Sequence, residues 1–161
     1  HGTRTGEDLF LHYFRHVAIR RPEVYGCENV PGMRKFPVVM EAMTQLPDYH
    51  VSVFCPVAAH TWLPQRRDRL IILGSRKPFS WRPCVAHYAK DLSTRLVCDR
   101  RCPHGVRPYS VREYARLQGV PDRFEFAGTA QQAYRQIGNG VPVPMAEWAE
   151  REIRRYFGEA D

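Results

Sequence analysis

The stretch Arg69-Leu70-Ile71-Ile72-Leu73-Gly74 decides the predicted fold, because it holds four apolar side chains in a row with no polar residue between them. Successive side chains of a strand point to opposite faces of its sheet, so this run predicts a strand that is covered on both faces. Covering both faces takes helices as well as strands. The sequence therefore predicts an α/β domain built around residues 69–74.

The residues before this strand supply four more elements. Apolar residues at helical spacing predict a helix over 5–21 and another over 33–46, whereas 24–30 and 49–57 have the short apolar runs of strands. The order helix, strand, helix, strand, strand is typical of an α/β layer with some parallel pairing. Three strands form a narrow sheet with an exposed edge, so we expect further strands from another segment or chain.

The residues after the strand are less regular. Residues 76–106 contain several prolines and no sustained period, which predicts a loop-rich connector. Ser110 and Glu113 form a capping-box pattern at the start of a short helix that ends at Leu117, and residues 144–157 predict a final helix. The predicted fold class is therefore α/β with a small loop-rich C-terminal subdomain.

Composition narrows the classes of function. The 161 residues include 24 basic and 17 acidic side chains, giving a formal net charge of +7 that favours a nucleic-acid partner, although a GC-rich genome produces the same arginine bias. The apolar runs are too short to span a membrane, and five cysteines without a framework spacing favour a reducing cytoplasm. Because residue 1 is His, the sequence is compatible with a processed product or an excerpt of a longer protein.

Two motifs border the predicted strands. Glu28 and Asn29 end the strand over 24–30, where a doubly wound sheet presents ligand-binding groups, although a carboxylate beside an amide is also a common hydrogen-bonding pair. Pro64-Gln65-Arg66-Arg67-Asp68-Arg69 leads into the apolar strand. In an extended chain Arg67 and Arg69 leave the same face and can converge on one ligand, with a solvated charge run as the alternative.

Two further motifs lie in the C-terminal half. Arg107-Pro108-Tyr109-Ser110-Val111-Arg112-Glu113 continues through the short helix to Gln118-Gly119, and Gln136-Ile137-Gly138-Asn139-Gly140 precedes the final helix. A Gly-Asn-Gly turn lets the backbone approach a ligand closely, although a simple tight turn has the same composition.

The four motifs follow the order found in the second half of the catalytic domain of DNA cytosine-5 methyltransferases, and the chain resembles that family from about Gly6 to Phe157. The resemblance implies a partial AdoMet-dependent methyltransferase sheet of the Rossmann-like kind, from a bacterium or a phage. Residues 1–78 would be the second half of the catalytic domain, 79–125 a reduced recognition region, and 126–161 a segment that returns to the catalytic domain.

The same resemblance implies roles for individual residues. Glu28 would hold N3 and the amino group of the target cytosine, with Asn29 as its neighbour. Arg69, paired with Arg67, would reach the cytosine O2. The expected AdoMet contacts are Leu9, Asn139 and Gly140, and the expected DNA contacts are Gln65, Arg107 and Arg112, of which Arg112 would brace the small DNA-facing domain.

The chain departs from the family pattern in two places. The family's Pro-Cys-Gln nucleophile loop and glycine-rich AdoMet loop would precede Gly6, and Pro83-Cys84-Val85 follows Arg69 and lacks the next Gln or Asn of a nucleophile motif. The connector is also much shorter than the family's target-recognition region. The connector contains four residues of the types that bind zinc: Cys84, His87, Cys98 and Cys102. Their spacing matches no common zinc finger, so no metal is expected.

The resemblance implies a reaction that the chain alone is not expected to complete. Members of the family transfer a methyl group from AdoMet to C5 of a flipped cytosine in double-stranded DNA, after a cysteine thiolate has added to C6. We therefore expect a chain that is inactive alone and is completed by a second chain or segment carrying the nucleophile and glycine-rich loops. An excerpt or degenerate copy of a longer enzyme, and a noncatalytic DNA-binding or regulatory subunit, are the alternatives.

Overall fold

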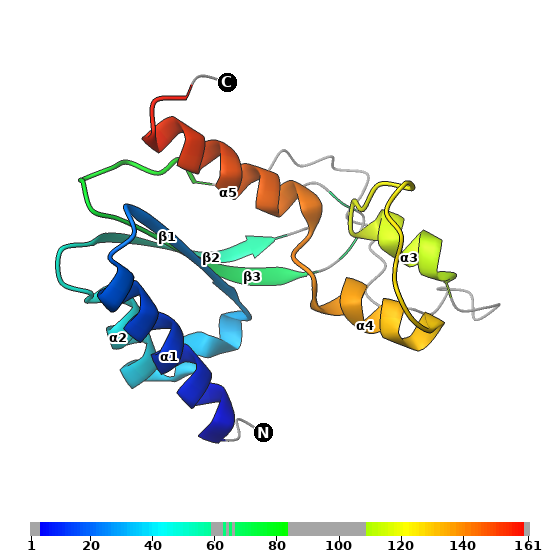
Figure 1. Ribbon diagram of the computed structural model, residues 1–161, viewed down its shortest axis with the longest axis horizontal. Helices are drawn as coiled ribbons and strands as arrows, with labels where there is room; N and C mark the ends of the chain where they lie inside the picture. The colour runs from blue at the N-terminus through cyan, green and yellow to red at the C-terminus, as the bar shows by residue number, and fades with distance from the viewer. Residues whose placement is uncertain (1–3, 59–62, 64, 66, 84–108, 160–161) are drawn as a thin grey trace. The chain divides into compact units, whose positions relative to one another are not determined.

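A computed structural model of the chain describes residues 4–58, 63, 65, 67–83 and 109–159 (Figure 1). The chain divides into two compact units. The first consists of His1–Val57 and Asp68–Pro83, and the second of Ala58–Arg67 and Cys84–Asp161. The domain boundaries predicted at residues 78 and 125 concern roles within an enzyme and stay a prediction.

The first unit begins with a helix, and its strands follow at nearly the predicted positions. Its elements are α1 (Arg4–Arg20), β1 (Val24–Asn29), the 3-10 helix η1 (Pro31–Lys35), α2 (Pro37–Thr44), β2 (His50–Ala58) and β3 (Asp68–Ser75). Strand β3 lies between β1 and β2, so the sheet order is β1-β3-β2.

The helix predicted over residues 33–46 is two elements, so that prediction was wrong. The 3-10 helix ends at Lys35, Phe36 is extended with φ −108° and ψ 90°, and α2 begins with Pro37 at its first position. A proline disfavours the helical conformation of the residue before it and lacks the N–H that a continuing helix would use. Pro37 therefore starts a helix where the apolar spacing alone suggested an uninterrupted one.

Strands β1 and β3 run antiparallel, with Val24 opposite Ser75 and Asn29 opposite Leu70. The parallel pairing expected from the element order is not found in this pair. The order of strands leaves one side of β1 without a strand partner among the described residues, as an edge strand is.

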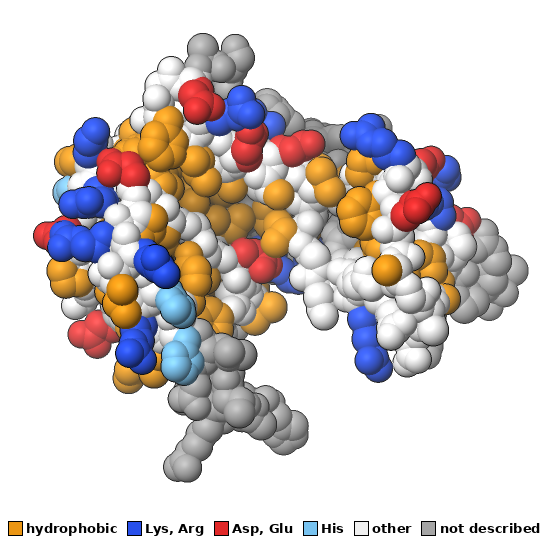
Figure 2. Space-filling model, viewed as in Figure 1, with side chains coloured by type: hydrophobic (Ala, Val, Ile, Leu, Met, Phe, Trp, Pro, Cys, Tyr) orange, Lys and Arg blue, Asp and Glu red, His pale blue; other side chains and the backbone are white. Residues whose placement is uncertain are grey.

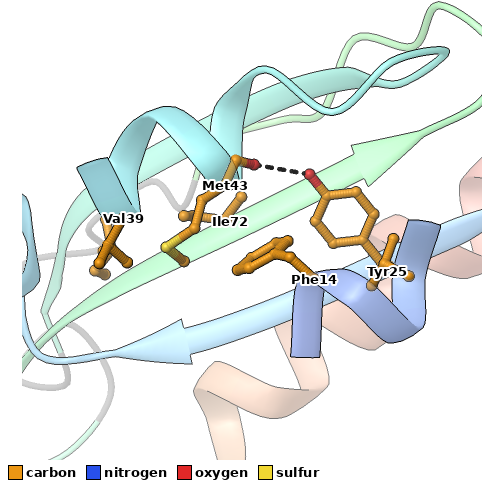
Figure 3. Close-up of a cluster of buried hydrophobic side chains, with 7 residues drawn as sticks. Phe14, Tyr25, Val39, Met43 and Ile72 are labelled. Carbon is orange, nitrogen blue, oxygen red and sulfur yellow. Dashed lines mark hydrogen bonds between the residues drawn. The ribbon is translucent and has the colours of Figure 1, made fainter. Parts of the chain in front are cut away.

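The core of the first unit lies between the two helices and one face of the sheet (Figure 3). Phe14 and Val17 of α1 and Val39 and Met43 of α2 pack there against the sheet. The buried Tyr25 hydroxyl donates to the Met43 carbonyl oxygen at 3.0 Å, so this polar group keeps a partner inside the core.

Strand β3 is buried on both faces. None of the side chains from Leu70 to Leu73 is more than 5% exposed. Leu70 and Ile72 face the α1–α2 core, whereas Ile71 and Leu73 alternate with them and are buried on the other face. The double coverage predicted from the apolar run is thereby confirmed.

The second unit contains three described helices: α3 (Val111–Leu117), α4 (Ala130–Asn139) and α5 (Val143–Tyr156). Helix α3 has the predicted capping box, in which the Ser110 hydroxyl accepts from the Glu113 N–H at 3.2 Å and the Glu113 carboxylate accepts from the Ser110 N–H at 2.8 Å. Helix α5 matches the predicted final helix.

Helix α4 was not predicted, and it corrects the interpretation of the Gly138-Asn139-Gly140 sequence. Gly138 and Asn139 form the last positions of α4, and Gly140 caps it with an ordinary φ of −68°. The sequence signal for this helix is a second capping box, in which Thr129 and Gln132 each bond to the backbone N–H of the other. The glycines mark the end of a helix here and no left-handed turn.

None of the described helices is long and apolar enough to cross a lipid bilayer.

Candidate functional site

The strand pairing brings Glu28 and Arg69 together. Glu28 lies opposite Ile71, and Arg69 is two residues before Ile71, so both side chains leave the same face of the sheet. The Arg69 Nε lies 2.6 Å from the Glu28 Oε1 in an ion pair, and the two side chains are 15% and 29% exposed. The structure thus pairs the two residues expected to hold the cytosine ring, in a position that solvent partly reaches.

Asn29 has a local partner. Its side-chain Oδ1 accepts from the Val30 N–H at 2.7 Å. Because consecutive residues of a strand point to opposite faces, Asn29 leaves the sheet on the face opposite to Glu28. The Asn29 side chain thus bonds to the backbone at the end of β1.

Arg67 contacts the end of α4. Its Nη1 donates to the Gly138 carbonyl at 2.8 Å and its Nη2 to the Gly140 carbonyl at 2.7 Å. The last carbonyls of a helix lack internal donors and carry a partial negative charge, so a guanidinium is a favourable partner for them. Arg67 and Arg69 therefore hold different groups, and the expected convergence of the pair on one ligand is not observed.

Gln65, expected at DNA, bonds within the second unit. Its Nε2 donates to the Leu117 carbonyl at 2.6 Å and to the Gln118 Oε1 at 2.8 Å. Gln118 in turn donates from its own Nε2 to the Ile137 carbonyl at 2.7 Å and is only 3% exposed. Sequence reasoning quoted Gln118 in a motif but assigned it no role; the signal was a glutamine directly before the glycine that ends a helix.

Arg112 braces the loop that follows α3. Its two terminal nitrogens donate to the carbonyls of Pro121 and Phe124 at 3.3 and 3.0 Å. The DNA-facing role expected of Arg112 stays a prediction. Arg107 lies outside the described residues, as do the four zinc-type residues of the connector, Cys84, His87, Cys98 and Cys102.

The residues expected at AdoMet lie in both units. Leu9 belongs to α1, but its side chain is outside the described part of the chain. Asn139 is exposed at the end of α4, and the Gly140 N–H closes that helix by donating to the Gln136 and Ile137 carbonyls at 3.0 and 3.2 Å. A polar, exposed amide beside a firmly bonded backbone segment fits one wall of a site for a polar cofactor.

Comparison with known proteins identifies the family. The family model described as C-5 cytosine-specific DNA methylase matches residues 1–96 and 87–155. The chain belongs to this family. Two curated relatives of the chain are M.Sau96I, a type II methyltransferase of Staphylococcus aureus, and M.PspPI, a type II methyltransferase of Psychrobacter sp. (strain TA137).

The similarity to these relatives covers part of each protein. M.Sau96I is 38% identical over 87 residues, which are 53% of this chain and 20% of the relative. M.PspPI is 49% identical over 75 residues, which are 42% of this chain and 18% of the relative. The chain therefore spans about one fifth of the length of the curated relatives it matches.

Solved structures establish the fold of this chain. A protein assigned as a DNA modification methyltransferase and encoded within an E. coli prophage superposes with a TM-score of 0.78 at 17% identity, covering 97% of this chain and 76% of that one. The Entamoeba histolytica methyltransferase EhMeth gives 0.73 at 14% identity, covering 94% and 69%. The small sheet with its helices is thus a partial AdoMet-dependent methyltransferase fold.

The described part of the chain contains two cysteines, Cys27 and Cys55, both free thiols. Burial, and secondarily the negative charge of Glu28, raises the pKa of Cys27 to about 11. A cysteine nucleophile acts as the thiolate, and Cys27 stays protonated at neutral pH. Cys27 therefore does not replace the nucleophile of the family. Among the described residues no three His, Cys, Asp or Glu side chains are grouped to hold a metal ion.

Proposed function

We propose that this chain is part of a DNA cytosine-5 methyltransferase and supplies the residues that hold the target cytosine. The observation that carries the proposal is the pairing of Glu28 with Arg69 at 2.6 Å on one face of the sheet. An acid and a guanidinium side by side can meet N3 and O2 of one pyrimidine ring, which lie next to each other on its edge.

The chemistry explains why a cytosine needs these two groups. Carbon 5 of cytosine is a poor nucleophile until a thiolate has added to C6, and the negative charge then spreads over N3 and O2. Glu28 would share a proton with N3, and Arg69 would neutralise O2. AdoMet, when bound, supplies the methyl group. The target base must leave the duplex to reach such residues.

Asn29 and Arg67 contact other parts of the protein, which supports fewer contacts to the cytosine ring than the motifs alone suggest. Asn29 shapes the end of β1 through its bond to the Val30 N–H, and Arg67 holds carbonyls at the end of α4. We assign the ring contacts to Glu28 and Arg69, and a supporting role to Asn29 and Arg67. We also propose that Leu9, Asn139 and Gly140 contact AdoMet.

A second chain or segment would carry the nucleophile and glycine-rich loops. Two exposed surfaces of the first unit, on which another chain or segment could pack, support this part of the proposal. The unpaired side of β1 offers backbone groups to another strand, and an apolar pocket of about 270 Å³ lies between α1 and α2. Leu11, Phe36 and Val38 are exposed in its lining, and Figure 2 shows hydrophobic side chains at the surface among basic ones.

The net charge of +7 favours a second candidate, a noncatalytic subunit that binds DNA phosphates and regulates a methyltransferase. This candidate and the first differ in what Glu28 contributes. A phosphate-binding subunit has no use for a carboxylate beside its arginine, whereas a cytosine-holding site requires it.

The test combines the purified chain with an N-terminal methyltransferase segment, duplex DNA and methyl-labelled AdoMet. We expect methylation of cytosine only when both proteins are present, and its loss when the chain carries Glu28→Gln. Equal methylation with the wild-type chain and the Glu28→Gln chain would contradict the proposal and favour the noncatalytic subunit. Omitting the chain provides the background rate.

A further inference from the structure

Gln118 is held in a fixed place by the way α3 ends. Gly119 follows it with a φ of +76°, and the N–H groups of Gly119 and Val120 donate to the carbonyls of Arg116 and Ala115 at 2.9 and 3.0 Å. These bonds form a Schellman motif, which requires a residue free to adopt the left-handed conformation. A Cβ on Gly119 would also lie 3.0 Å from Pro144 Cδ. The glycine thus fixes the direction in which Gln118 points.

The Gln118 side chain is buried with both ends of its amide bonded. The Nε2 donates to the Ile137 carbonyl at 2.7 Å, and the Oε1 accepts from Gln65 Nε2 at 2.8 Å. Only a side chain that donates and accepts at the same end can satisfy both neighbours. Leaving either neighbour unsatisfied in this buried place would cost about 1–3 kcal/mol.

Arg67 continues the same set of contacts along the end of α4. Gln118 bonds the Ile137 carbonyl, and Arg67 bonds the carbonyls of Gly138 and Gly140. Asn139 lies between these held peptides, and its side chain is exposed. Every contact in this set lies within the second unit. The backbone around Asn139 is therefore fixed from the protein side, and its amide is presented outward.

We infer that Gln118 is a positioning residue for the cofactor, acting through the backbone of residues 137–140, with Arg67 as its partner. The inference rests on the proposed function, which assigns Asn139 and Gly140 to AdoMet. Gln118 itself touches neither the cofactor nor the base. Gln118 holds the backbone of residues 137–140, which contacts the cofactor. This segment is therefore already ordered in the folded chain, so that AdoMet binding does not have to supply the entropy cost of ordering it.

The experiment follows the backbone amide signals of Asn139 and Gly140 in the ¹⁵N-labelled chain while AdoMet is added to millimolar concentration. The wild-type chain should show saturable shifts at both amides with a weak dissociation constant. In Gln118→Glu a carboxylate oxygen faces the Ile137 carbonyl and repels it. We expect AdoMet affinity at these two amides to fall at least about tenfold, which corresponds to roughly 1.4 kcal/mol.

The matched control lies at the other end of the same helix. Gln132 accepts from the Thr129 N–H at 2.8 Å in the capping box of α4, so Gln132→Ala weakens the helix without touching residues 137–140. We expect its AdoMet affinity to stay within about twofold of the wild type. Gln118→Met, which keeps the length of the side chain without its polar atoms, serves if Gln118→Glu does not fold.

Three outcomes are decisive. A selective loss of affinity in the Gln118 variants supports the inference. Equal losses in Gln118 and Gln132 variants of matched thermal stability, or no loss in either, overturn it and leave Gln118 a purely structural residue. Absence of shifts at Asn139 and Gly140 in the wild-type chain overturns the cofactor assignment of the proposed function and the positioning role with it. Because the wild-type titration alone reveals a failure of the cofactor assignment, it can be distinguished from a failure of the positioning role of Gln118, which appears only in the variants.

Discussion

The ion pair of Glu28 with Arg69 is the residue-scale observation on which the proposed function rests. The two residues are distant in the sequence, and the antiparallel register makes them diagonal neighbours on one face. The Glu28 and Arg69 side chains are 29% and 15% exposed. The ion pair is therefore partly shielded from solvent, and a ligand can still reach it and replace the contact between the two side chains.

Replacing Glu28 by Gln keeps the shape and removes the proton that can be shared with N3. In the assembled enzyme we expect transition-state stabilisation to fall by about 2–4 kcal/mol, more than DNA affinity falls, and Arg69→Ala to act similarly. Single-turnover rates and DNA binding, measured on the same preparations, separate the two effects.

A connector arginine provides the control for these variants. Arg95→Ala should mainly weaken the salt-sensitive part of DNA binding and leave the single-turnover rate of bound DNA unchanged. If Glu28→Gln and Arg69→Ala instead unfolded the protein while turnover per folded molecule stayed normal, both residues would be structural and the assignment wrong.

The Cys27 thiol predicts how stability depends on pH. Its pKa of about 11 in the folded chain exceeds the ordinary thiol value of 9.0, because burial disfavours the thiolate. The unfolded chain therefore loses this proton first as the pH rises, so the contribution is complete below about pH 9 and is lost as the pH rises through about 11. When the pH is raised from 8 to 10, the free energy of unfolding should fall in both proteins, and the fall should be about 1 kcal/mol smaller in Cys27→Ala than in the wild type.

Urea titrations at the two pH values measure this difference. Tyr13, whose pKa is raised to about 12 by burial and secondarily by the charge of Cys27, is present in both proteins, so the part of its effect that comes from burial is common to them. Parallel losses in the wild type and Cys27→Ala would mean that the thiol is solvated in the folded chain.

At the scale of elements, the β1–β3 pair depends on a glycine for close packing. Tyr25 lies opposite Gly74, and a Cβ built on Gly74 would come within 2.2 Å of the Tyr25 ring. Moving the ring would disturb the core and the bond of its hydroxyl to the Met43 carbonyl. Gly26, in the same pair of strands, has space, because its Cβ would meet only Leu73 Cδ2 at an ordinary 3.5 Å.

Gly74→Ala should therefore destabilise the chain by about 2–3 kcal/mol through overpacking, whereas Gly26→Ala should change stability by less than about 1 kcal/mol. Urea unfolding monitored by circular dichroism measures both, and Gly26→Ala is the matched control. Similar losses in the two variants would show that the sheet adjusts to the Tyr25 ring or that strand propensity dominates.

At the scale of the whole molecule, the proposed function assigns the cytosine-holding pair to one unit, and Asn139 and Gly140 as AdoMet contacts to the other. Cys27 offers no activated thiolate, because burial holds it protonated. The proposal therefore assigns the nucleophile to a second chain or segment.

The chain alone should show no detectable methyltransferase activity. Incubation with an oligonucleotide containing 5-fluorocytosine and AdoMet should yield no covalent complex on a denaturing gel, because trapping needs a thiolate at C6. The same oligonucleotide with a complete cytosine-5 methyltransferase is the positive control. A trapped complex with this chain alone would overturn the prediction and make Cys84 the first candidate nucleophile.

The amino-acid sequence by itself determined the local elements. The apolar run Leu70–Leu73 specified a doubly covered strand, and the Ser110–Glu113 capping box specified the start of α3. Such signals act between residues a few positions apart and need no tertiary context. Helix α4 was missed although its Thr129–Gln132 capping box is equally local, because Gly138-Asn139-Gly140 suggested a turn.

Only the tertiary structure decided which side chains meet. The register of β1 on β3 placed Glu28 beside Arg69 and sent Asn29 to the other face. The end of α3 brought Gln118 to the Ile137 carbonyl, and the same region turned Arg67 toward Gly138. Hydrogen bonds between residues far apart in the chain depend on strand register and on how helices end. Those features are settled by packing the whole core, so motif spacing could nominate these residues but not assign their partners.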